Sequence, residues 1–226
     1  MNNLISKKFN FLKIEVPKSI LLLMIVAVVF NLLRIILWGK MSFVYILWNL
    51  FLALIPFVIS LILLYLHKEG KLNKLIFIIG IIFWIIFLPN APYLVTDLIH
   101  LGETKIVPII YDTLLLFSSA LLGVVLAFYS LSHIEEIVRK SLSKKKTILI
   151  MILIILLVSF GIYLGRFLRF NSWDIFVNHY ALLKNIWEIL SQMAGHAEVY
   201  LFTIMYSFFL FFSYQAWKEI GKNDSF

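Results

Sequence analysis

Polar and charged side chains gather in three short segments of an otherwise apolar chain. The first segment runs from Phe87 to Gly102 and reads FLPNAPYLVTDLIHLG. Residues three or four apart share one face of a helix, so Tyr93, Asp97 and His100 are expected to lie on the same side. A carboxylate beside an imidazole can act as a general acid–base pair, and this segment is therefore a candidate for catalysis.

The second segment, PIIYDTLL, holds Asp112 near the start of a predicted helix, where a carboxylate complements the positive end of the helix dipole. The third, GIYLGRFLRFNSWD, holds Arg166 and Arg169 three residues apart. Two guanidinium groups on one side of a helix could bind the phosphate or carboxylate of a lipid headgroup or a solute. The alternative is that the charged residues of all three segments form structural ion pairs that join helix ends. The sequence leaves both interpretations open.

These segments supply the candidate residues of a polar pocket on the extracytoplasmic side. The hypothetical catalytic residues are Asp97, His100 and Asp112. The candidate ligand-binding residues are Asn90, Tyr93, Arg166, Arg169, Asn171, Trp173 and Asp174.

Neither a metal nor a cofactor is predicted. Asp97 with His100, and His196 with Glu198, are ligand types that suit zinc, but neither spacing is a strong metal motif. The alternative for these histidines is ordinary hydrogen bonding at the membrane interface. The chain has no cysteine, which excludes thiolate metal sites and cysteine nucleophiles. It also lacks the glycine motifs that bind nucleotide phosphates and the serine motif of a nucleophile elbow.

The elements that position these residues are predicted to be membrane-spanning helices. Hydrophobic residues make up 62% of the 226 residues and charged residues 14%, with a mean hydropathy of +0.99, whereas soluble domains are about 45–50% apolar and about 25% charged. A spanning helix needs about 20 mostly apolar residues. The sequence therefore predicts an all-α, polytopic bundle forming a single domain over residues 1–226. Its six predicted spans are Lys18–Trp38, Ser42–Leu66, Leu72–Leu88, Pro108–Leu131, Thr147–Gly165 and Glu198–Trp217.

The basic residues predict the orientation of the bundle. The net charge is +8, and most of the 20 lysine and arginine residues fall in the segments that lie on the side of the N-terminus. Because cytoplasmic loops carry the excess of lysine and arginine, we expect a multi-pass protein of the cell membrane with cytoplasmic tails at 1–17 and 218–226. The expected partner is the lipid bilayer, including anionic lipid, while the scattered charges argue against nucleic acid. The oligomeric state is left open.

Two short interfacial helices are predicted on the extracytoplasmic side. Pro89 and Pro92 bracket Asn90, so we expect the third span to end at Leu88 and a short helix, capped by Asn90, to run from Pro92 to Gly102. A second helix is expected from Trp173 to about Ser191, capped by Asn171 or Ser172. Its polar strip and apolar remainder are typical of a helix that lies flat on a leaflet.

The phrases NAPYLVTDLIHL and GRFLRFNSWD carry a family resemblance. With YDTLL between them, they resemble a bacterial family of multi-spanning membrane proteins known as domain of unknown function 1361. The resemblance covers about residues 20 to 215. It implies a bacterial membrane protein and favours the polar segments as a site, but the family brings no established activity.

Three functions are compatible with these patterns, and whether the chain is an enzyme is left open. The first is a pocket that binds an anionic lipid-linked envelope substrate, with modification of that substrate as a further hypothesis. The second is a transporter for a small solute or ion, although the centres of the predicted spans lack ionisable residues. The third is a non-catalytic membrane partner in which the charges form structural pairs.

Overall fold

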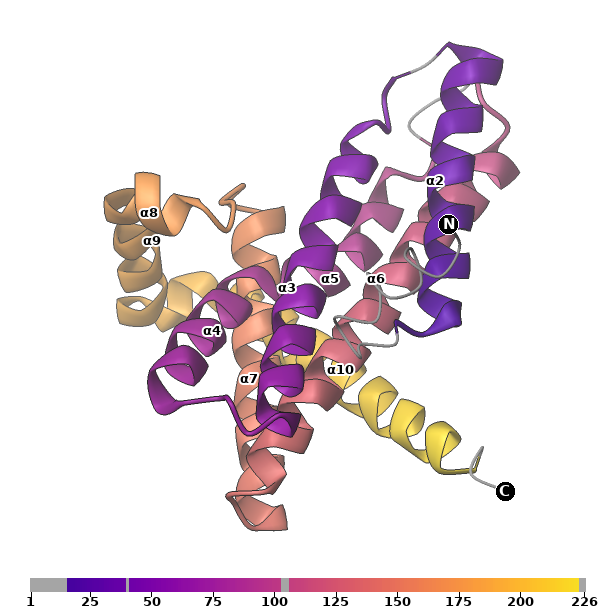
Figure 1. Ribbon diagram of the computed structural model, residues 1–226. Coiled ribbons are helices and arrows are strands. Elements are labelled where there is room, and N and C mark those ends of the chain that lie inside the picture. The colour runs from indigo at the N-terminus through magenta and orange to yellow at the C-terminus, as the bar shows by residue number, and fades with distance from the viewer. Residues whose placement is uncertain (1–15, 40, 103–105, 224–226) are drawn as a thin grey trace, which may run out of the picture.

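The computed structural model describes residues 16–39, 41–102 and 106–223, and within them every regular element is a helix (Figure 1). Six segments are long and apolar enough to cross a membrane, which confirms the predicted all-α polytopic bundle. The elements are α2 (Lys18–Trp38), α3 (Tyr45–Lys68), α4 (Lys74–Phe87), α5 (Asn90–Tyr93), the 3₁₀ helix η1 (Leu94–His100), α6 (Ile109–Arg139), α7 (Lys144–Arg166), α8 (Asp174–Val177), α9 (His179–Ser191), the 3₁₀ helix η2 (Met193–His196) and α10 (Ala197–Asn223).

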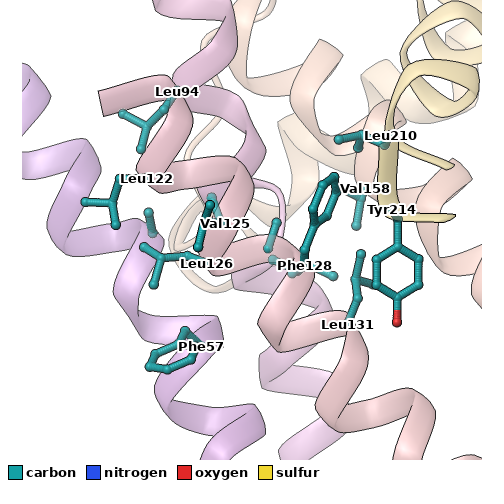
Figure 2. Close-up of a cluster of buried hydrophobic side chains, with 14 of the residues drawn as sticks. Phe57, Leu94, Leu122, Val125, Leu126, Phe128, Leu131, Val158, Leu210 and Tyr214 are labelled. Atoms are coloured by element: carbon teal, nitrogen blue, oxygen red, sulfur yellow. The ribbon is translucent and has the colours of Figure 1, made fainter. Parts of the chain in front are cut away.

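The helix α6 is the centre of the bundle. In its most apolar stretch 72% of the residues are buried, a larger share than in any other span. It packs against α2, α3, α5 and η1, and its side chains Leu122 and Leu126 are fully buried (Figure 2). A Cβ atom at Gly123 would collide with the carbonyl oxygen of Ala91, so only glycine lets α5 cross α6 this closely.

The third span is interrupted, as the two prolines predict. The helix α4 ends at Phe87, and the chain continues through Pro89 into α5 and then into the tighter turns of η1. Gly102 follows with a φ of +87°, which agrees with its predicted role as the end of the short helix. Asn90 is not the cap that was expected, because it is itself the first residue of α5. Its amide donates to the Phe87 carbonyl oxygen at 2.8 Å.

The predicted helix from Trp173 to Ser191 is in fact two helices. Asn178, with φ −134° and ψ 37°, separates α8 from α9. The predicted cap by Asn171 or Ser172 is also wrong. The Asp174 carboxylate instead accepts a hydrogen bond from the Asn171 backbone N–H at 2.5 Å. In Figure 1 this pair of helices lies on the far side of α7 from α2.

The two ends of the bundle differ in their polar contacts. We call the end that bears η1, α8 and α9 the site end. At the opposite end, α6 continues beyond the predicted Leu131 to Arg139. There Glu135 is largely buried and binds α10, because it accepts a hydrogen bond from the Tyr214 hydroxyl at 2.6 Å and one from Lys218 Nζ at 3.0 Å. This end is therefore held by a compact α6–α10 contact.

Candidate functional site: a polar network beside a cavity

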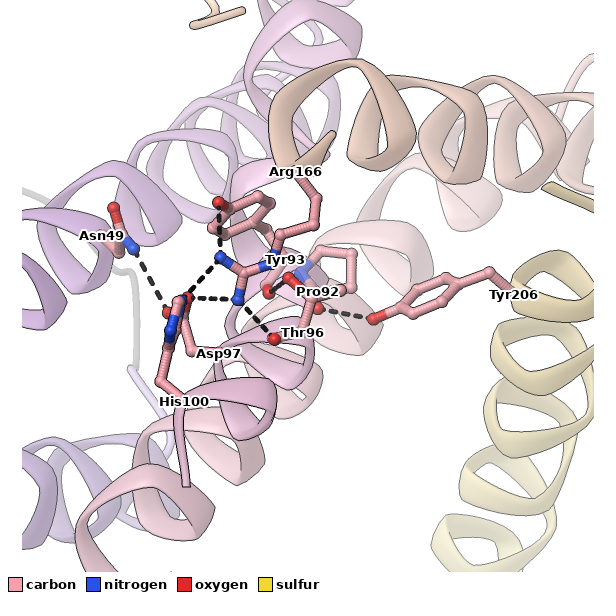
Figure 3. A network of polar contacts seen from close by, with 8 residues as sticks. All are labelled: Asn49, Pro92, Tyr93, Thr96, Asp97, His100, Arg166 and Tyr206. Atoms are coloured by element: carbon pink, nitrogen blue, oxygen red, sulfur yellow. Dashed lines mark hydrogen bonds and ion pairs between the residues drawn. The ribbon is translucent and has the colours of Figure 1, made fainter. Parts of the chain in front are cut away.

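A network centred on Arg166 joins three separate spans at the site end (Figure 3). Its Nη2 donates to Asp97 Oδ1 at 2.9 Å and to the Thr96 carbonyl oxygen. Its Nη1 donates to the Tyr93 hydroxyl oxygen at 3.2 Å and lies 3.1 Å from His100 Nε2. The last residue of α7 thus contacts the Tyr93, Asp97 and His100 face that the spacing predicts.

The donor chemistry of arginine fixes the direction of its hydrogen bond with Tyr93. A guanidinium group has only donors, so the Tyr93 oxygen must accept. The Tyr93 oxygen already accepts from Arg166, which leaves the Tyr93 O–H proton to point elsewhere.

Asp97 is the anionic partner of this network and is almost fully buried. Its side chain is 2% exposed and that of Arg166 is 12% exposed. The second carboxylate oxygen accepts a hydrogen bond from Asn49 Nδ2 of α3 at 3.2 Å. Because a buried carboxylate is stable only when paired and hydrogen-bonded, the broken third span needs partners from both α3 and α7.

Asp112 belongs to a second cluster. Its two carboxylate oxygens accept from Nε and Nη2 of Arg34 at 2.8 and 3.3 Å, a bidentate pair with side chains 1% and 2% exposed. The Arg34 guanidinium also donates to Ser42 and lies 4.2 Å from the centroid of the Phe43 ring. This contact is an ion pair that joins α2 to α6, and its basic partner lies outside the three segments among which ion pairs were expected.

Arg169 lies outside both clusters. The helix α7 ends at Arg166, and Arg169 follows with a φ of +59° and an exposed side chain. The expectation that Arg166 and Arg169 share one side of a helix is therefore wrong. A left-handed backbone costs a residue other than glycine about 1–2 kcal/mol, so the chain maintains this strained arginine at the surface.

The remaining predicted residues follow Arg169 in the connection to α8. Asp174 binds the backbone of Asn171, and the Ser172 hydroxyl accepts a hydrogen bond from Asn90 Nδ2 at 2.8 Å. The Trp173 ring meets the Trp48 ring edge-on with centroids 6.2 Å apart. Through Ser172 and Trp173 this connection contacts the third span and α3.

A cavity of about 850 Å³ lies beside the Arg166 network. Its walls come from α3, α4, α5, α7, α8, α9 and α10, and leucine and isoleucine are its most frequent lining residues. Tyr93 and Asn49 belong to both the network and the lining, so the two features share a boundary. The other polar lining residues are Asn90, Asn171, Ser172, Tyr200 and Thr203.

The lining of the cavity is largely apolar, and its few polar side chains are amides and hydroxyls. No charged side chain and no histidine is among its lining residues in the described chain. Asp97, His100 and Asp112 thus do not face this space, and four of the five Arg166 N–H groups are used within the network. The described residues also contain no group of three or more metal-ligand side chains. The arrangement suits binding of a molecule with a polar end and an apolar body.

Some residues of the site carry no clear signal in the sequence. Arg34 and Asn49 lie within predicted spans, and a lone polar residue in such a helix has many potential partners. An intramembrane ionisable residue does point to a pairing, which could have singled out Arg34 but not its partner. Thr203 was similarly hidden on α10, where its hydroxyl oxygen is buried without a partner among the described residues.

Comparison with known proteins supports this description without naming an activity. No significant match is found among curated proteins or among solved structures. The family model described as a protein of unknown function, DUF1361, matches residues 48–212, which include the Arg166 network and every lining residue of the cavity. The chain therefore belongs to the DUF1361 family of proteins of unknown function.

Proposed function

We propose that this membrane protein binds an anionic amphiphile of one bilayer leaflet, with the apolar chain in the cavity and the headgroup at the site end. The observation that carries the proposal is the cavity itself, which is apolar along α7 and bordered by amides and hydroxyls at the site end. Ligand pockets of about 300–1,000 Å³ with a few placed polar groups are typical of small-molecule sites.

The depth of the cavity fits a lipid chain. Its lining follows α7 from Leu153 to Gly165, a distance of about 18 Å at the helical rise of about 1.5 Å per residue. The hydrocarbon core of a bilayer is about 30 Å thick, so this depth is close to that of one leaflet. The excess of basic residues at the opposite end favours the outer leaflet.

Arg169 supports an anionic headgroup. It directly precedes Phe170 and Asn171, which both line the cavity. Strained backbone positions persist where the surrounding structure requires them, often at ligand sites. Arg169 is therefore the proposed headgroup residue, whereas Arg166 is neutralised by Asp97 and positions Tyr93. With no carboxylate or histidine lining the cavity in the described chain, the geometry favours binding over modification of the ligand.

Native mass spectrometry of the purified protein tests the cavity. Phosphatidylglycerol serves as the anionic probe and phosphatidylcholine as its zwitterionic counterpart. Leu157→Trp adds bulk to the lining, and we expect it to lower lipid occupancy at least fivefold. Leu149→Trp is the matched control, because Leu149 is equally exposed on the same helix but lies outside the cavity. Equal occupancy in the two variants would contradict the proposal.

The same measurement tests the headgroup. Arg169→Gly removes the guanidinium, and we expect the preference for phosphatidylglycerol over phosphatidylcholine to be lost. Lys184→Gln removes one exposed positive charge from α9 at the same end and is expected to keep the preference. A preference that survives in Arg169→Gly would exclude Arg169 from headgroup recognition.

Transport is a second candidate function, and the interrupted third span favours it. Transporters commonly bind substrates where helices are broken within the membrane, and here the break at Pro89 adjoins the charged Arg166 network. The measurement is flux of small anions and cations into proteoliposomes. Flux that is absent in wild type across such a panel would leave lipid binding as the function.

A further inference from the structure

We infer that α8 and α9 form a lateral gate, through which the amphiphile enters the cavity directly from the bilayer. This inference rests on the proposed function and specifies its substrate as a molecule that already resides in the membrane. It depends on three features of the α8–α9 segment: its two apolar faces, its aromatic contacts with neighbouring elements, and its attachment at one end.

The apolar residues of α9 occupy two adjoining faces, about 100° apart around the helix, and its polar strip lies on the remaining side. Leu182 and Ile186 line the cavity, while Tyr180, Leu183 and Trp187 are largely exposed on the outer side. Lipid chains are as apolar as leucine side chains, so an apolar face gains little by packing on protein rather than on lipid. When α9 moves outward, its inner face exchanges cavity contacts for lipid contacts, and the motion meets little opposition from burial.

Aromatic pairs hold the segment against the neighbouring elements. Phe176 of α8 stacks on Phe83 of α4 with ring centroids 6.1 Å apart, and the two side chains are 57% and 43% exposed. The Trp48–Trp173 contact lies just before α8 and joins the segment to α3. Phe83, Phe176 and Trp48 are half-exposed, and Trp173 is partly buried, so neither pair is enclosed in the core. They are contacts that can part and re-form without exposing a buried polar group.

The other end of the segment is anchored. The Tyr200 hydroxyl of α10 donates to the Ile189 carbonyl oxygen of α9 at 2.8 Å, and Ile189 is 3% exposed. Asn178 and Gln192, at the two ends of α9, both have non-helical backbone angles. The arrangement is therefore a helix anchored at its C-terminal end to α10. The connection before α8 is held by the Asn90–Ser172 hydrogen bond, and the edge at α8 itself meets α4 through the Phe83–Phe176 pair. Parting Phe83 from Phe176 opens this edge toward the lipid.

Thiol crosslinking tests the gate directly, because the natural chain contains no cysteine. The two cysteines of the variant Phe83→Cys/Phe176→Cys are joined with a short crosslinker that a reducing agent cleaves. The protein is loaded with phosphatidylglycerol in mixed micelles and then given a deuterated form of the same lipid. Native mass spectrometry follows the exchange. We expect the crosslink to slow exchange at least tenfold and its cleavage to restore the rate.

Two further variants complete the test. Phe208→Cys/Phe212→Cys joins two exposed rings 4.4 Å apart on α10, away from the cavity, and its crosslink should leave exchange unchanged. If the first variant fails to fold, Trp48→Cys/Trp173→Cys closes the same segment. Exchange that is equally fast with and without the gate crosslink would overturn the gate while leaving lipid binding intact. Absence of bound phosphatidylglycerol even in wild type would overturn the proposed function, and the gate with it.

Discussion

The two buried arginines of the site end have the same partner type but different surroundings. Arg34 meets Asp112 in a bidentate pair, and the Phe43 ring and Ser42 complete its environment. Arg166 meets Asp97 and a backbone carbonyl oxygen through Nη2, and a phenol and an imidazole through Nη1. The first cluster lies apart from the cavity, whereas the second shares Tyr93 and Asn49 with it.

This difference predicts separate roles for the two clusters. A fully enclosed ion pair can do little except join α2 to α6, and its removal leaves an uncompensated charge. The Arg166 network distributes its hydrogen bonds over several partners and holds a cavity-lining tyrosine in place. Substitutions in the first cluster should therefore act on stability, and those in the second on ligand binding as well.

The largest expected effect is that of Asp112→Ala. Because Arg34 is 1% exposed, losing its partner should cost about 3–5 kcal/mol of stability. Thermal unfolding of the detergent-solubilised protein, followed by size-exclusion chromatography, measures this loss. The double variant Arg34→Leu/Asp112→Leu removes both charges and should recover most of it. A double variant as unstable as Asp112→Ala would show that the loss does not come from an uncompensated charge on Arg34.

A smaller loss is expected for Asp97→Asn. Arg166 keeps its other acceptors and a side chain that is 12% exposed, so we expect about 2 kcal/mol, the value of a hydrogen bond to a charged group. Unlike Asp112→Ala, this variant should also lower phosphatidylglycerol occupancy in the protein that remains folded. Equal stability losses at Asp97 and Asp112, with occupancy unchanged, would remove the distinction between the clusters.

Tyr93→Phe tests the shared boundary with a smaller change. The variant loses the phenol that Arg166 holds at 3.2 Å, which should cost about 1 kcal/mol, and we expect lipid occupancy to fall about fivefold. Tyr206→Phe is its control, because that phenol donates to the Pro92 carbonyl oxygen at 2.7 Å and lies outside the cavity lining. Native mass spectrometry should then show a loss of lipid in the first variant alone.

The smallest effect has the opposite sign. Arg169→Gly relieves a left-handed backbone strain of about 1–2 kcal/mol, part of which is offset by the greater freedom of glycine in the unfolded chain. We expect a net stabilisation of up to about 1 kcal/mol in thermal unfolding. Arg169→Ala retains the Cβ atom and the strain, so it should show no gain. Equal stability of Arg169→Gly and Arg169→Ala would show that the left-handed backbone at this position does not destabilise the protein.

Local signals in the sequence predicted much of this molecule correctly. The apolar runs gave six spans, because a bilayer demands length and low charge from each helix independently of the others. Pro89 and Pro92 predicted the interruption of the third span, because each proline lacks the N–H that would continue the helical hydrogen bonds. The extended backbone expected before each proline is absent, since Leu88 keeps helical angles and Ala91 lies within α5. The spacing of Tyr93, Asp97 and His100 likewise predicted a common face.

What tertiary structure alone decided is which side chains meet. Asp97 and Asp112 look equivalent in the sequence, yet one pairs with Arg166 and the other with Arg34, 78 positions away. Arg166 and Arg169 also look equivalent in the sequence. Arg166 is the last residue of α7 and faces the bundle, whereas Arg169 lies in the turn that follows and is exposed. Spacing along one helix determines which residues share a face, but the packing of six helices determines what that face contacts. The cavity depends on this packing too, since its walls combine residues from α3, the third span, α7, α8, α9 and α10.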